Sequence, residues 1–345
     1  MLYYQTQDGL KNIGNTLFGL TQKTIARLAG ITNGTVSRGL SKANVEPINK
    51  SGEHGKYLRY SVDDVRNFFK TNIFQNAAKE PCKVISFYNF KGGTGKTSIC
   101  FQVSSHLAMM GFNVLVIDAD PQGHLSTSLS FDNTHSYPTL SDLISGVVNM
   151  EDASHEIYSG LTCIPANLSL TRLEVSLNEL PKREERLKIL LDSIKPKYDF
   201  VIFDTNPTIS LLNRNILVCS DLIAIICETQ PYSLNGLKLL MEDMHKFYGN
   251  MQLKIPDIFL VPNKYEDRAT SSAEAMSVLR QHYAEFMLPD FAIRRSEEIN
   301  TAAKLSQPLG FFARSNSIAL EDISDLIHAL LMKINSSIKF TKQAA

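Results

Sequence analysis

The sequence predicts an α/β protein, with a doubly wound, mostly parallel sheet preceded by a small helix-rich N-terminal domain. From residue 83 onward, short apolar runs alternate with stretches of helical periodicity, which is typical of a sheet with helices on both faces. Two runs, 114–117 and 222–226, are unbroken, as expected for central strands that are buried on both sides. A glycine-rich segment at 91–97 follows the first run, so the ligand site is expected at the carboxyl ends of the strands.

The expected elements follow one another in chain order. Strands are predicted at 83–90, 113–118, 161–165, 200–204, 221–227 and 257–262. Helices are predicted at 96–110, 184–194, 234–247 and 271–285. Periodicity is lost near 71–81, so we expect two domains, 1–80 and 81–345, which agrees with a length of 345 residues.

Charge is divided unevenly between the two expected domains. Residues 1–80 hold 11 Lys and Arg against 6 Asp and Glu, a net charge of +5, and the other residues hold 24 against 29, a net charge of −5. A basic small domain suggests contact with nucleic acid, although a charge of this size also fits an ordinary solvated surface.

Composition favours a cytoplasmic protein without a membrane segment. No apolar run is long enough to cross a bilayer, and the first residues lack the pattern of a signal peptide. The five cysteines are scattered and none forms a Cys-x-x-Cys pair, so we expect buried thiols and not disulfides or metal ligands.

The segment 91–97, Lys-Gly-Gly-Thr-Gly-Lys-Thr, predicts a site for a nucleoside triphosphate. Its glycines allow backbone N–H groups to wrap closely around phosphate oxygens at the start of a helix. Lys96 is expected on the β- and γ-phosphates, and the Thr97 hydroxyl on Mg²⁺. The usual pattern has glycine at position 90, where this chain has Phe90, and this chain carries an additional lysine, Lys91. The nucleotide-binding candidates are Lys91, Gly92, Gly93, Thr94, Gly95, Lys96, Thr97 and Ser98.

This loop resembles the deviant Walker A signature of the ParA/MinD class of P-loop ATPases, and the resemblance extends over residues 83–335. Within that class the chain is most similar to plasmid-type ParA partition proteins, which have an N-terminal DNA-binding domain. The resemblance implies that ATP and Mg²⁺ are the cofactors and that Lys91 reaches across a homodimer interface to the partner's phosphates. It also implies that ATP favours a sandwich dimer, since charge-assisted phosphate contacts contribute about 1.5–3 kcal/mol each, and that hydrolysis removes this stabilisation.

Two strand ends supply acidic groups. Asp118 and Asp120 belong to Asp-Ala-Asp-Pro-Gln-Gly, which resembles the family's Asp-x-Asp-Pro-Gln-Gly motif. By that resemblance Asp120 orients the attacking water and Asp118 lies near the Mg²⁺ shell, while capping of the following turn by one of them is the alternative. Asp204 follows an apolar run like a Walker B aspartate that holds Mg²⁺, although Asn206 stands where the family has proline. The catalytic candidates are therefore Lys91, Lys96 and Asp120, and the metal candidates are Thr97, Asp118 and Asp204.

Asn263 is the candidate for contact with the nucleotide base. It follows the apolar run 257–262 and is able to pair with a purine edge, and the resemblance places this region beside the adenine. Asparagine is also a favoured turn residue, so an ordinary turn is the alternative.

Residues 20–65 predict the N-terminal fold. A helix over 20–31 that ends in a glycine turn, a second short helix over 32–40, a hairpin at 51–60 and a capped helix start at 61–65 follow in order. This order resembles winged helix-turn-helix domains of the MerR-like kind, which implies contact with a major groove. A small packing or dimerisation domain is the alternative, and residues 1–19 receive no assignment. The DNA-binding candidates here are Thr35, Ser37, Arg38, Lys56 and Arg59.

The segment 292–315 carries further basic candidates. It resembles the part of ParA proteins that lines a surface for non-specific DNA, where phosphate contacts give salt-dependent affinity. The candidates are Arg294, Arg295 and Arg314, with Lys304 behind them. Surface ion pairs with Glu297 and Glu298 are the alternative.

Together these features predict a nucleoid-associated DNA-partition ATPase. Hydrolysis is expected to need Mg²⁺ and to be weak until a ParB-like centromere-binding partner stimulates it, and the N-terminal domain is expected to bind operator DNA for autorepression. A nucleotide-regulated repressor is one alternative. A MinD-like positioning ATPase is another, but the tail 332–342 is short and mostly polar for a membrane anchor. Iron–sulfur relatives such as nitrogenase reductase need paired cysteines, which the chain lacks.

Overall fold

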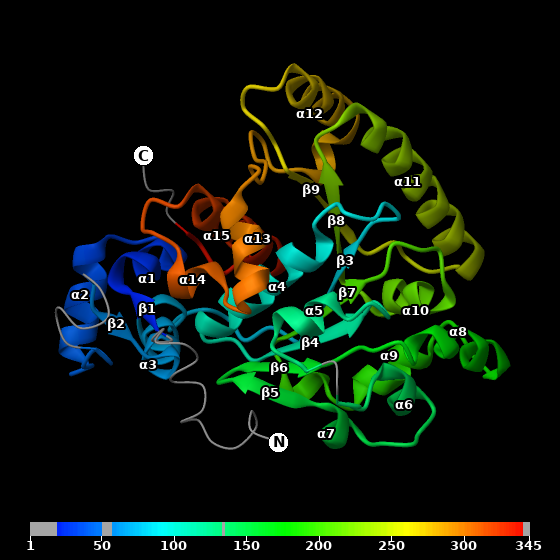
Figure 1. Ribbon diagram of the computed structural model, residues 1–345, viewed down its shortest axis with the longest axis horizontal. Helices are drawn as coiled ribbons and strands as arrows, with labels where there is room; N and C mark the ends of the chain where they lie inside the picture. The colour runs from blue at the N-terminus through cyan, green and yellow to red at the C-terminus, as the bar shows by residue number, and fades with distance from the viewer. Residues whose placement is uncertain (1–18, 50–56, 133–134, 341–345) are drawn as a thin grey trace.

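A computed structural model describes residues 19–49, 57–132 and 135–340 of the chain (Figure 1). Its centre is a seven-stranded sheet with the order β5-β6-β4-β7-β3-β8-β9, in which every neighbouring pair is parallel except β5 and β6. The strands are β3 Lys83–Tyr88, β4 Val114–Ala119, β5 His155–Tyr158, β6 Leu161–Ile164, β7 Phe200–Thr205, β8 Leu222–Glu228 and β9 Asp257–Asn263. The predicted mostly parallel α/β sheet is confirmed, and all six predicted strands are present with small shifts in their bounds.

In the seven-stranded sheet, the strand that the sequence did not predict is β5, at one edge. Within the described part of the chain it pairs only with β6, in the antiparallel sense, and it carries the polar residues His155 and Glu156 on a partly exposed edge. An edge strand with one exposed side shows no unbroken apolar run, so periodicity gave no signal for it.

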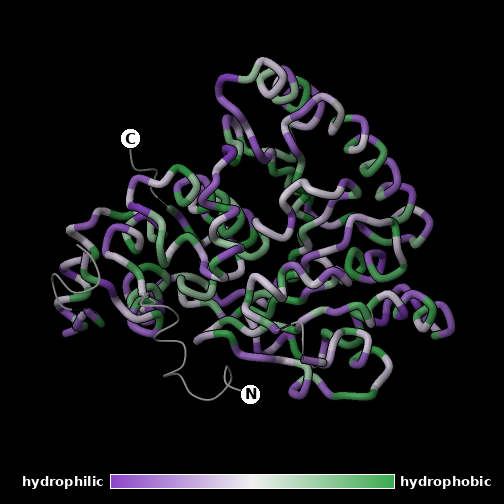
Figure 2. The backbone as a smooth tube through the Cα atoms, in the orientation of Figure 1, coloured by the Kyte–Doolittle hydropathy of each residue, from purple (hydrophilic) through white to green (hydrophobic). Residues whose placement is uncertain are grey.

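Helices cover both faces of the sheet, as Figure 1 shows. The side chains of β4 alternate between two cores, with Val114 and Val116 in one and Leu115 and Ile117 in the other. The first core is shared with α4 Lys96–Met109 and α15 Ile318–Ile334, and the second with α8 Leu170–Glu179, α9 Arg186–Asp192 and α10 Leu211–Cys219. A third core joins β8 and β9 to α11 Pro231–Met251 and α12 Thr270–Tyr283. Figure 2 shows the result, with hydrophobic residues along the central strands and hydrophilic residues gathered on outer helices and loops.

Shorter helices complete the large domain. They are α5 His124–Ser128, α6 Leu140–Ile144, α7 Met150–Ala153, α13 Glu297–Leu305 and α14 Leu309–Phe312. The predicted helices at 96–110, 184–194, 234–247 and 271–285 correspond to α4, α9, α11 and α12. None of the helices in the described ranges combines the length and the apolar character needed to cross a membrane.

The N-terminal segment forms a compact helical unit. Its elements are β1 Leu20–Thr21, α1 Gln22–Ala29, α2 Asn33–Lys42, β2 Arg59–Tyr60, α3 Val62–Phe68 and a π-helical turn Phe69–Ile73. Thr21, Thr32 and Ser61 cap the three helices through their side-chain oxygens, and Gly30 ends α1 in the left-handed conformation at φ 63°. Two helices joined by a glycine turn are therefore present, while most of the predicted hairpin at 51–60 lies outside the described residues.

This unit shares a core with the large domain. Leu20, Ile25 and Phe69 belong to the same buried cluster as residues of α4 and α15. The guanidinium of Arg66 donates to the carbonyls of Ala108 and Phe112 at the end of α4, the second at 2.7 Å, and to Asn113 Oδ1 at 2.9 Å. Residues on both sides of the predicted boundary thus pack as one body, and the division at residue 80 stays a prediction.

Candidate nucleotide-binding site

The loop between β3 and α4 wraps back on itself at the carboxyl end of the sheet. Gly93 and Gly95 adopt left-handed backbone angles, with φ of 74° and 94°, which residues with a side chain adopt only at a cost. Asn89 fixes the entry to the loop, since its Nδ2 donates to the Ile226 carbonyl at 2.7 Å and its Oδ1 accepts from the Lys91 N–H at 3.0 Å. Asn89 was not among the predicted residues, because an asparagine before a glycine loop has no distinctive sequence signal.

Lys96, the first residue of α4, is buried with a side chain that has little to bind within the protein. It is 6% exposed, and its Nζ lies 3.4 Å from the Lys91 carbonyl. Burial lowers the pKa of Lys96, while Asp204 and Asp120 act in the opposite direction. A buried ammonium at a helix N-terminus inside a glycine loop is suited to a phosphate group. Thr97 and Ser98 follow it, and both are half-buried.

Asp204 ends β7 beside the loop and is the unpaired carboxylate of the site. It is fully buried, and among the described residues neither carboxylate oxygen has a hydrogen-bond partner at normal distance, although the Thr97 hydroxyl lies near enough to favour its charged form. Burial, followed by the neighbouring charge of Asp118, raises its pKa well above the usual range. A buried carboxylate without donors is costly, and a divalent cation next to it would remove that cost. Asp204 and Thr97 therefore fit the predicted Mg²⁺ role.

Both carboxylate oxygens of Asp118 accept hydrogen bonds within the protein. Its Oδ2 accepts from the Ser126 N–H at 2.8 Å and from the Ser126 hydroxyl at 2.7 Å, and its Oδ1 accepts from the Asp120 N–H at 3.1 Å. Burial raises its pKa to about 6, against the effect of these hydrogen bonds. These hydrogen bonds agree with the capping alternative for Asp118, and its predicted place near the Mg²⁺ shell stays a prediction. Asp120 is half-buried and accepts from the Gln122 N–H at 3.0 Å, which leaves its second oxygen available.

Within the described residues, no group of three or more His, Cys, Asp or Glu side chains is arranged to hold a metal. Mg²⁺ in phosphate sites commonly keeps several waters and takes one or two protein ligands together with phosphate oxygens. The site therefore fits a metal that arrives with a nucleotide.

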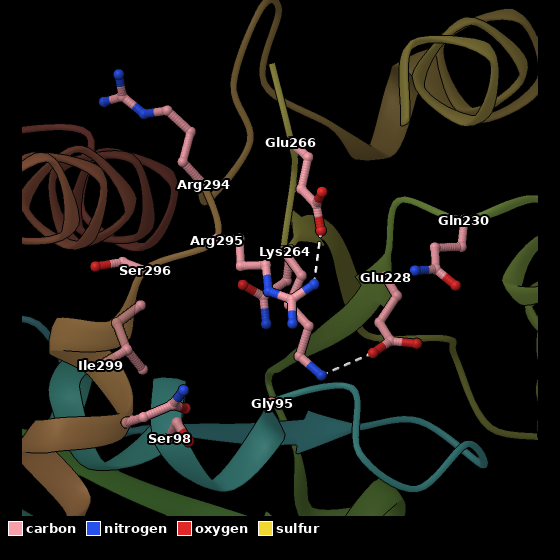
Figure 3. A pocket seen from close by; sticks show the side chains of 12 residues that line it. Gly95, Ser98, Glu228, Gln230, Lys264, Glu266, Arg294, Arg295, Ser296 and Ile299 are labelled. Carbon is pink, nitrogen blue, oxygen red and sulfur yellow. Dashed lines mark hydrogen bonds and ion pairs between the residues drawn. The ribbon is translucent and has the colours of Figure 1, made fainter. Parts of the chain in front are cut away.

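A pocket of about 330 Å³ opens beside the loop (Figure 3). Its walls include Gly95, Ser98, Asn263, Lys264, Glu266 and Arg295. Asn263 is 4% exposed and its Nδ2 donates to the Thr94 carbonyl at 2.7 Å, so its amide nitrogen is engaged with the loop. A contact between Asn263 and a base stays a prediction, and it would involve the amide oxygen.

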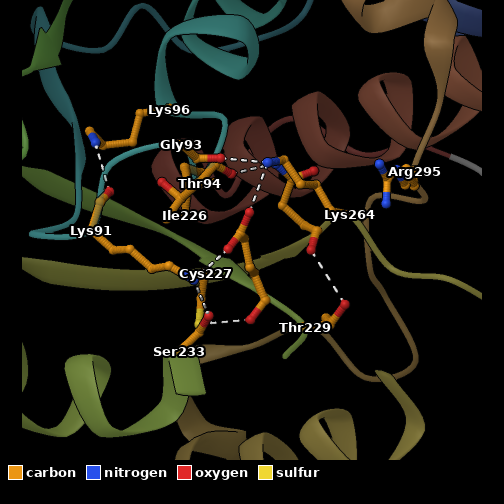
Figure 4. A network of polar contacts seen from close by, with 12 residues as sticks. Lys91, Gly93, Thr94, Lys96, Ile226, Cys227, Thr229, Ser233, Lys264 and Arg295 are labelled. Atoms are coloured by element: carbon orange, nitrogen blue, oxygen red, sulfur yellow. Dashed lines mark hydrogen bonds and ion pairs between the residues drawn. The ribbon is translucent and has the colours of Figure 1, made fainter. Parts of the chain in front are cut away.

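Lys91 folds back over its own subunit, as Figure 4 shows. Its Nζ lies 2.6 Å from Glu228 Oε2 and 3.0 Å from Ser233 Oγ. The other carboxylate oxygen of Glu228 lies 2.8 Å from Lys264 Nζ, which also donates to the Gly93 carbonyl at 2.5 Å. Glu228 and Lys264 were not among the residues predicted from the sequence. Glu228 follows the predicted strand 221–227 and Lys264 follows Asn263, but neither position carries a distinctive local pattern.

The basic residues of segment 292–315 differ in what they bind. Arg294 is engaged with Asp322, at 2.5–3.1 Å, and with Glu321 at 3.3 Å, so its guanidinium is not free for phosphate. Arg295 pairs with Glu266 at 2.7 Å. The ion-pair alternative thus holds for both arginines, but with partners other than Glu297 and Glu298.

Arg314 and Lys304 are exposed. Arg314 lies in an open groove of about 620 Å³. Acidic side chains share that groove, which reduces its attraction for DNA; they are Glu266, Asp267, Glu297 and Glu298.

The predicted DNA-binding residues of the N-terminal unit also differ in their exposure and contacts. Thr35 and Arg38 are exposed on α2, and Ser37 is half-buried there. Arg59 was predicted to contact DNA, but its guanidinium donates to the carbonyls of Gly19 and Phe311, and burial lowers its pKa. Since these bonds hold the N-terminal unit against α14, the structure argues against a DNA role for Arg59. Lys56 lies outside the described residues.

The protein family described as AAA domain matches residues 82–256. The chain is 29% identical over 283 residues to the cell division protein PomZ of Myxococcus xanthus, which covers 82% of this chain and 88% of PomZ. It is 29% identical over 232 residues to the chromosome partitioning protein ParA of Caulobacter vibrioides, which covers 66% of this chain and 86% of ParA.

Solved structures share the fold. The ATP complex of Cyanothece McdA superposes with a TM-score of 0.67 at 22% identity, over 76% of this chain and all of McdA (100%). Cobyrinic acid a,c-diamide synthase of Mycobacterium smegmatis, with a bound ATP analogue and magnesium, gives a TM-score of 0.63 at 23% identity, over 76% of this chain and 100% of that enzyme.

Proposed function

This chain belongs to the AAA-domain family of ParA/MinD-class P-loop ATPases, and from that premise we propose that it is an ATP-dependent DNA-partition protein. ATP binding drives two subunits into a sandwich dimer, and hydrolysis dissolves it. The dimer binds bulk DNA of the nucleoid in the cytoplasm, and a ParB-like centromere-binding partner stimulates otherwise weak hydrolysis.

The observation that carries this proposal is the pair of lysines on one loop. Lys96 is buried behind the loop beside Asp204, where it suits the phosphates of its own subunit's nucleotide. Lys91 has a side chain 43% exposed at the outer face of the loop, where a second subunit has access to it. Two subunits that share a pair of triphosphates need this arrangement, in which Lys96 points inward to its own nucleotide and Lys91 is accessible to the partner's nucleotide.

Each residue of the site then has a defined task. Lys96 and the N–H groups of the loop hold the β- and γ-phosphates, which positions the terminal phosphorus. Thr97 and Asp204 would hold Mg²⁺, and the bound ion would neutralise the charge that develops on the phosphate oxygens. Asp120 is half-buried at the end of β4, where its free oxygen orients the attacking water.

Two surfaces are proposed for DNA. The exposed face of α2, with Thr35 and Arg38, would bind operator DNA, with the first helix of the pair lying across the backbone. Arg314 and Lys304 would contribute salt-dependent contacts to non-specific DNA. Arg294, Arg295 and Arg59 are left out of these surfaces because their guanidinium groups are engaged within the protein.

Sedimentation velocity with and without ATP and Mg²⁺ tests the central proposal. The wild-type protein should shift from monomer to dimer when ATP is added, and Lys91→Ala should remove that shift while retaining ATP binding to the monomer. Lys188→Ala, at an exposed lysine of α9, is the matched control and should dimerise like the wild type. Dimerisation of Lys91→Ala at wild-type affinity would contradict the proposal.

A second candidate function is a nucleotide-regulated transcriptional repressor. The observation in its favour is that Arg66 binds the carboxyl end of α4, the helix that begins at the phosphate loop. Operator footprinting by the full chain with and without ATP distinguishes the two. If the protein is a repressor, nucleotide should change its affinity for the operator, but a plasmid that carries its operon should not be segregated by it.

A further inference from the structure

Glu228 is the shared partner of the two lysines at the mouth of the loop. It is the last residue of β8, and its side chain is 13% exposed, whereas Lys91 and Lys264 are each 43% exposed. One carboxylate oxygen lies 2.6 Å from Lys91 and the other 2.8 Å from Lys264. Figure 3 shows the contact of this carboxylate with Lys264, and in the sheet β8 lies between β3 and β9, the strands that Lys91 and Lys264 follow. We call these three side chains the Glu228 clamp.

The Lys264 side of the clamp is built into the fold. Lys264 has a left-handed backbone conformation, φ 57°, which costs a residue with a side chain about 1 kcal/mol. Its Nζ donates to the Gly93 carbonyl at 2.5 Å, while Asn263 donates to the Thr94 carbonyl at 2.7 Å. Asn263 and Lys264 thus bind two consecutive carbonyls of the loop. Because Lys264 is held there, its ammonium group also fixes the Glu228 carboxylate.

The Lys91 side of the clamp uses exposed atoms. The Lys91 ammonium is held by Glu228 and by Ser233 Oγ at 3.0 Å, and its backbone N–H is held by Asn89 at 3.0 Å. In the single subunit this lysine therefore does not extend toward a neighbour. To reach a phosphate across an interface, its side chain has to leave both of these oxygens.

A carboxylate and a triphosphate compete for the same ammonium groups. Because Glu228 is mostly buried, departure of Lys91 leaves part of its charge without a partner, which opposes release. A second subunit's triphosphate carries more charge and more acceptor oxygens than the Glu228 carboxylate. When that subunit approaches, Lys91 therefore binds the triphosphate in preference to Glu228. Lys264 remains within reach and keeps the carboxylate from being wholly unpaired.

We propose that Glu228 binds Lys91 within its own subunit and thereby raises the dissociation constant of the nucleotide-dependent dimer. This inference rests on the proposed function, since it assumes that Lys91 acts on a partner's phosphates. Glu228 is a positioning residue in this scheme, because it acts through Lys91.

Glu228→Gln tests the clamp, because glutamine keeps the size and an acceptor oxygen but removes the negative charge. Dimer dissociation constants are measured by sedimentation equilibrium with Mg²⁺ and AMPPNP, an ATP analogue that is not hydrolysed. The variant should dimerise about 5–10-fold more tightly than the wild type. This factor is small for a charge-assisted contact because the Lys91 side chain is partly exposed. Glu242→Gln, at an exposed glutamate of α11, is the matched control and should leave the constant unchanged.

A second pair of variants separates positioning from structure. Ser233→Ala removes the other contact of Lys91 without touching the carboxylate, so it should shift the constant in the same direction by a smaller factor. In the Lys91→Ala background Glu228→Gln should give no gain, since the clamp acts through that lysine. Restored dimerisation in the double variant would overturn the inference.

The outcomes distinguish this inference from the proposed function. If the wild type dimerises with AMPPNP but Glu228→Gln is unchanged or weaker while Ser233→Ala is also unchanged, the clamp is refuted and the sandwich stands. If the wild type does not dimerise at all, the proposed function fails and the clamp fails with it. Should Glu228→Gln prove unstable on thermal unfolding, Ser233→Ala alone decides between these results.

Discussion

The side-chain amide of Asn263 donates a hydrogen bond of 2.7 Å to the backbone carbonyl of Thr94, which joins the end of β9 to the phosphate loop. The amide nitrogen would lie only 2.4 Å from a Cβ placed on Gly95. The loop therefore has its shape because β9 and the loop pack without a side chain between them. This contact makes the conformation of the loop depend on a strand that lies two places away in the sheet, beyond β8.

Gly95→Ala should abolish nucleotide binding or weaken it by at least about a hundredfold. The new methyl group would displace Asn263, and φ of 94° is unfavourable for alanine, so the loop cannot keep its phosphate-binding shape. Isothermal titration with ATP and Mg²⁺ measures the effect. Gly146→Ala is the matched control, because Gly146 also has a positive φ, 72°, but nothing lies within 4 Å of the added atom. Equal loss in both variants would contradict this explanation.

Asp204→Asn should leave the thermal stability of the nucleotide-free protein unchanged or raise it by about 2–4 °C, since it replaces a carboxyl group whose charged form is disfavoured by burial. Hydrolysis should fall by about a hundredfold or more because the metal loses its protein carboxylate. The additional stabilisation that Mg²⁺ gives to the ATP-bound protein should disappear. Asp257→Asn, at an exposed residue of β9, should show none of these changes. A large loss of stability in Asp204→Asn alone would mean that this carboxylate has a structural partner.

The candidate site shows which residues a sequence can predict. Lys96, Thr97 and Asp204 follow from local patterns, since a glycine loop and an apolar run ending in a carboxylate each have a spacing set by backbone geometry. Glu228 and Lys264 do not, because their roles come from the order of β3, β8 and β9 in the sheet. That order places residues more than 130 positions apart side by side, as in the contact of Lys91 with Glu228, for which the separation is 137.

The same limit applies to the basic candidates. The sequence shows a run of arginines but not the carboxylates that face them, and Arg294 meets Asp322 only because α15 packs beside the segment that follows β9. Arg59 likewise meets the Phe311 carbonyl from a distant helix. The fold of the sheet was predictable because all of its strands except β5 are rich in apolar residues, whereas the charge pairs depend on tertiary packing.

His106 should make the protein less stable in acid. It is fully buried in α4, its Nε2 accepts from the Gly310 N–H at 3.0 Å, and burial lowers its pKa from 6.5 to about 4. Between these two values the unfolded chain binds more protons than the folded protein, so stability falls as pH falls from about 6.5 to about 4. The full effect is at most about 3 kcal/mol.

Urea unfolding at about pH 5 and about pH 7 measures this difference. His106→Gln, which retains a donor and an acceptor, should reduce the loss of stability at the lower pH. Asp118 contributes with the opposite sign over the same range, because its folded pKa of about 6 is above the unfolded value of 3.8. For this reason only the difference between wild type and variant reports on His106. An identical pH dependence in the two proteins would exclude it as the acid-sensitive group.

Arg66→Met should destabilise the protein by about 3–5 kcal/mol. Arg66 is 5% exposed and its guanidinium supplies donors to Ala108, Phe112 and Asn113, so its removal leaves buried acceptors unpaired. Because these acceptors lie at the end of α4, the N-terminal unit should loosen first, and proteolysis should cut the variant between the two predicted domains. Arg172→Met, at an exposed arginine of α8, is the control and should change the unfolding free energy by less than about 0.5 kcal/mol. An unchanged midpoint in Arg66→Met would show that the shared core alone holds the unit in place.

Arg314→Ala should weaken binding of the ATP-bound protein to DNA of arbitrary sequence. Arg314 is exposed in the open groove, whereas Arg294 and Arg295 nearby are neutralised by Asp322 and Glu266, so Arg314 supplies the available phosphate contact there. Loss of one phosphate contact should lower the slope of log affinity against log salt by about 1, and this slope is measured by fluorescence anisotropy over a salt series. Arg38→Ala, at an exposed arginine of α2, should leave that slope unchanged and weaken only operator binding. If Arg314→Ala keeps the wild-type slope, the acidic residues of the groove exclude DNA from it, and non-specific binding must use another face of the dimer.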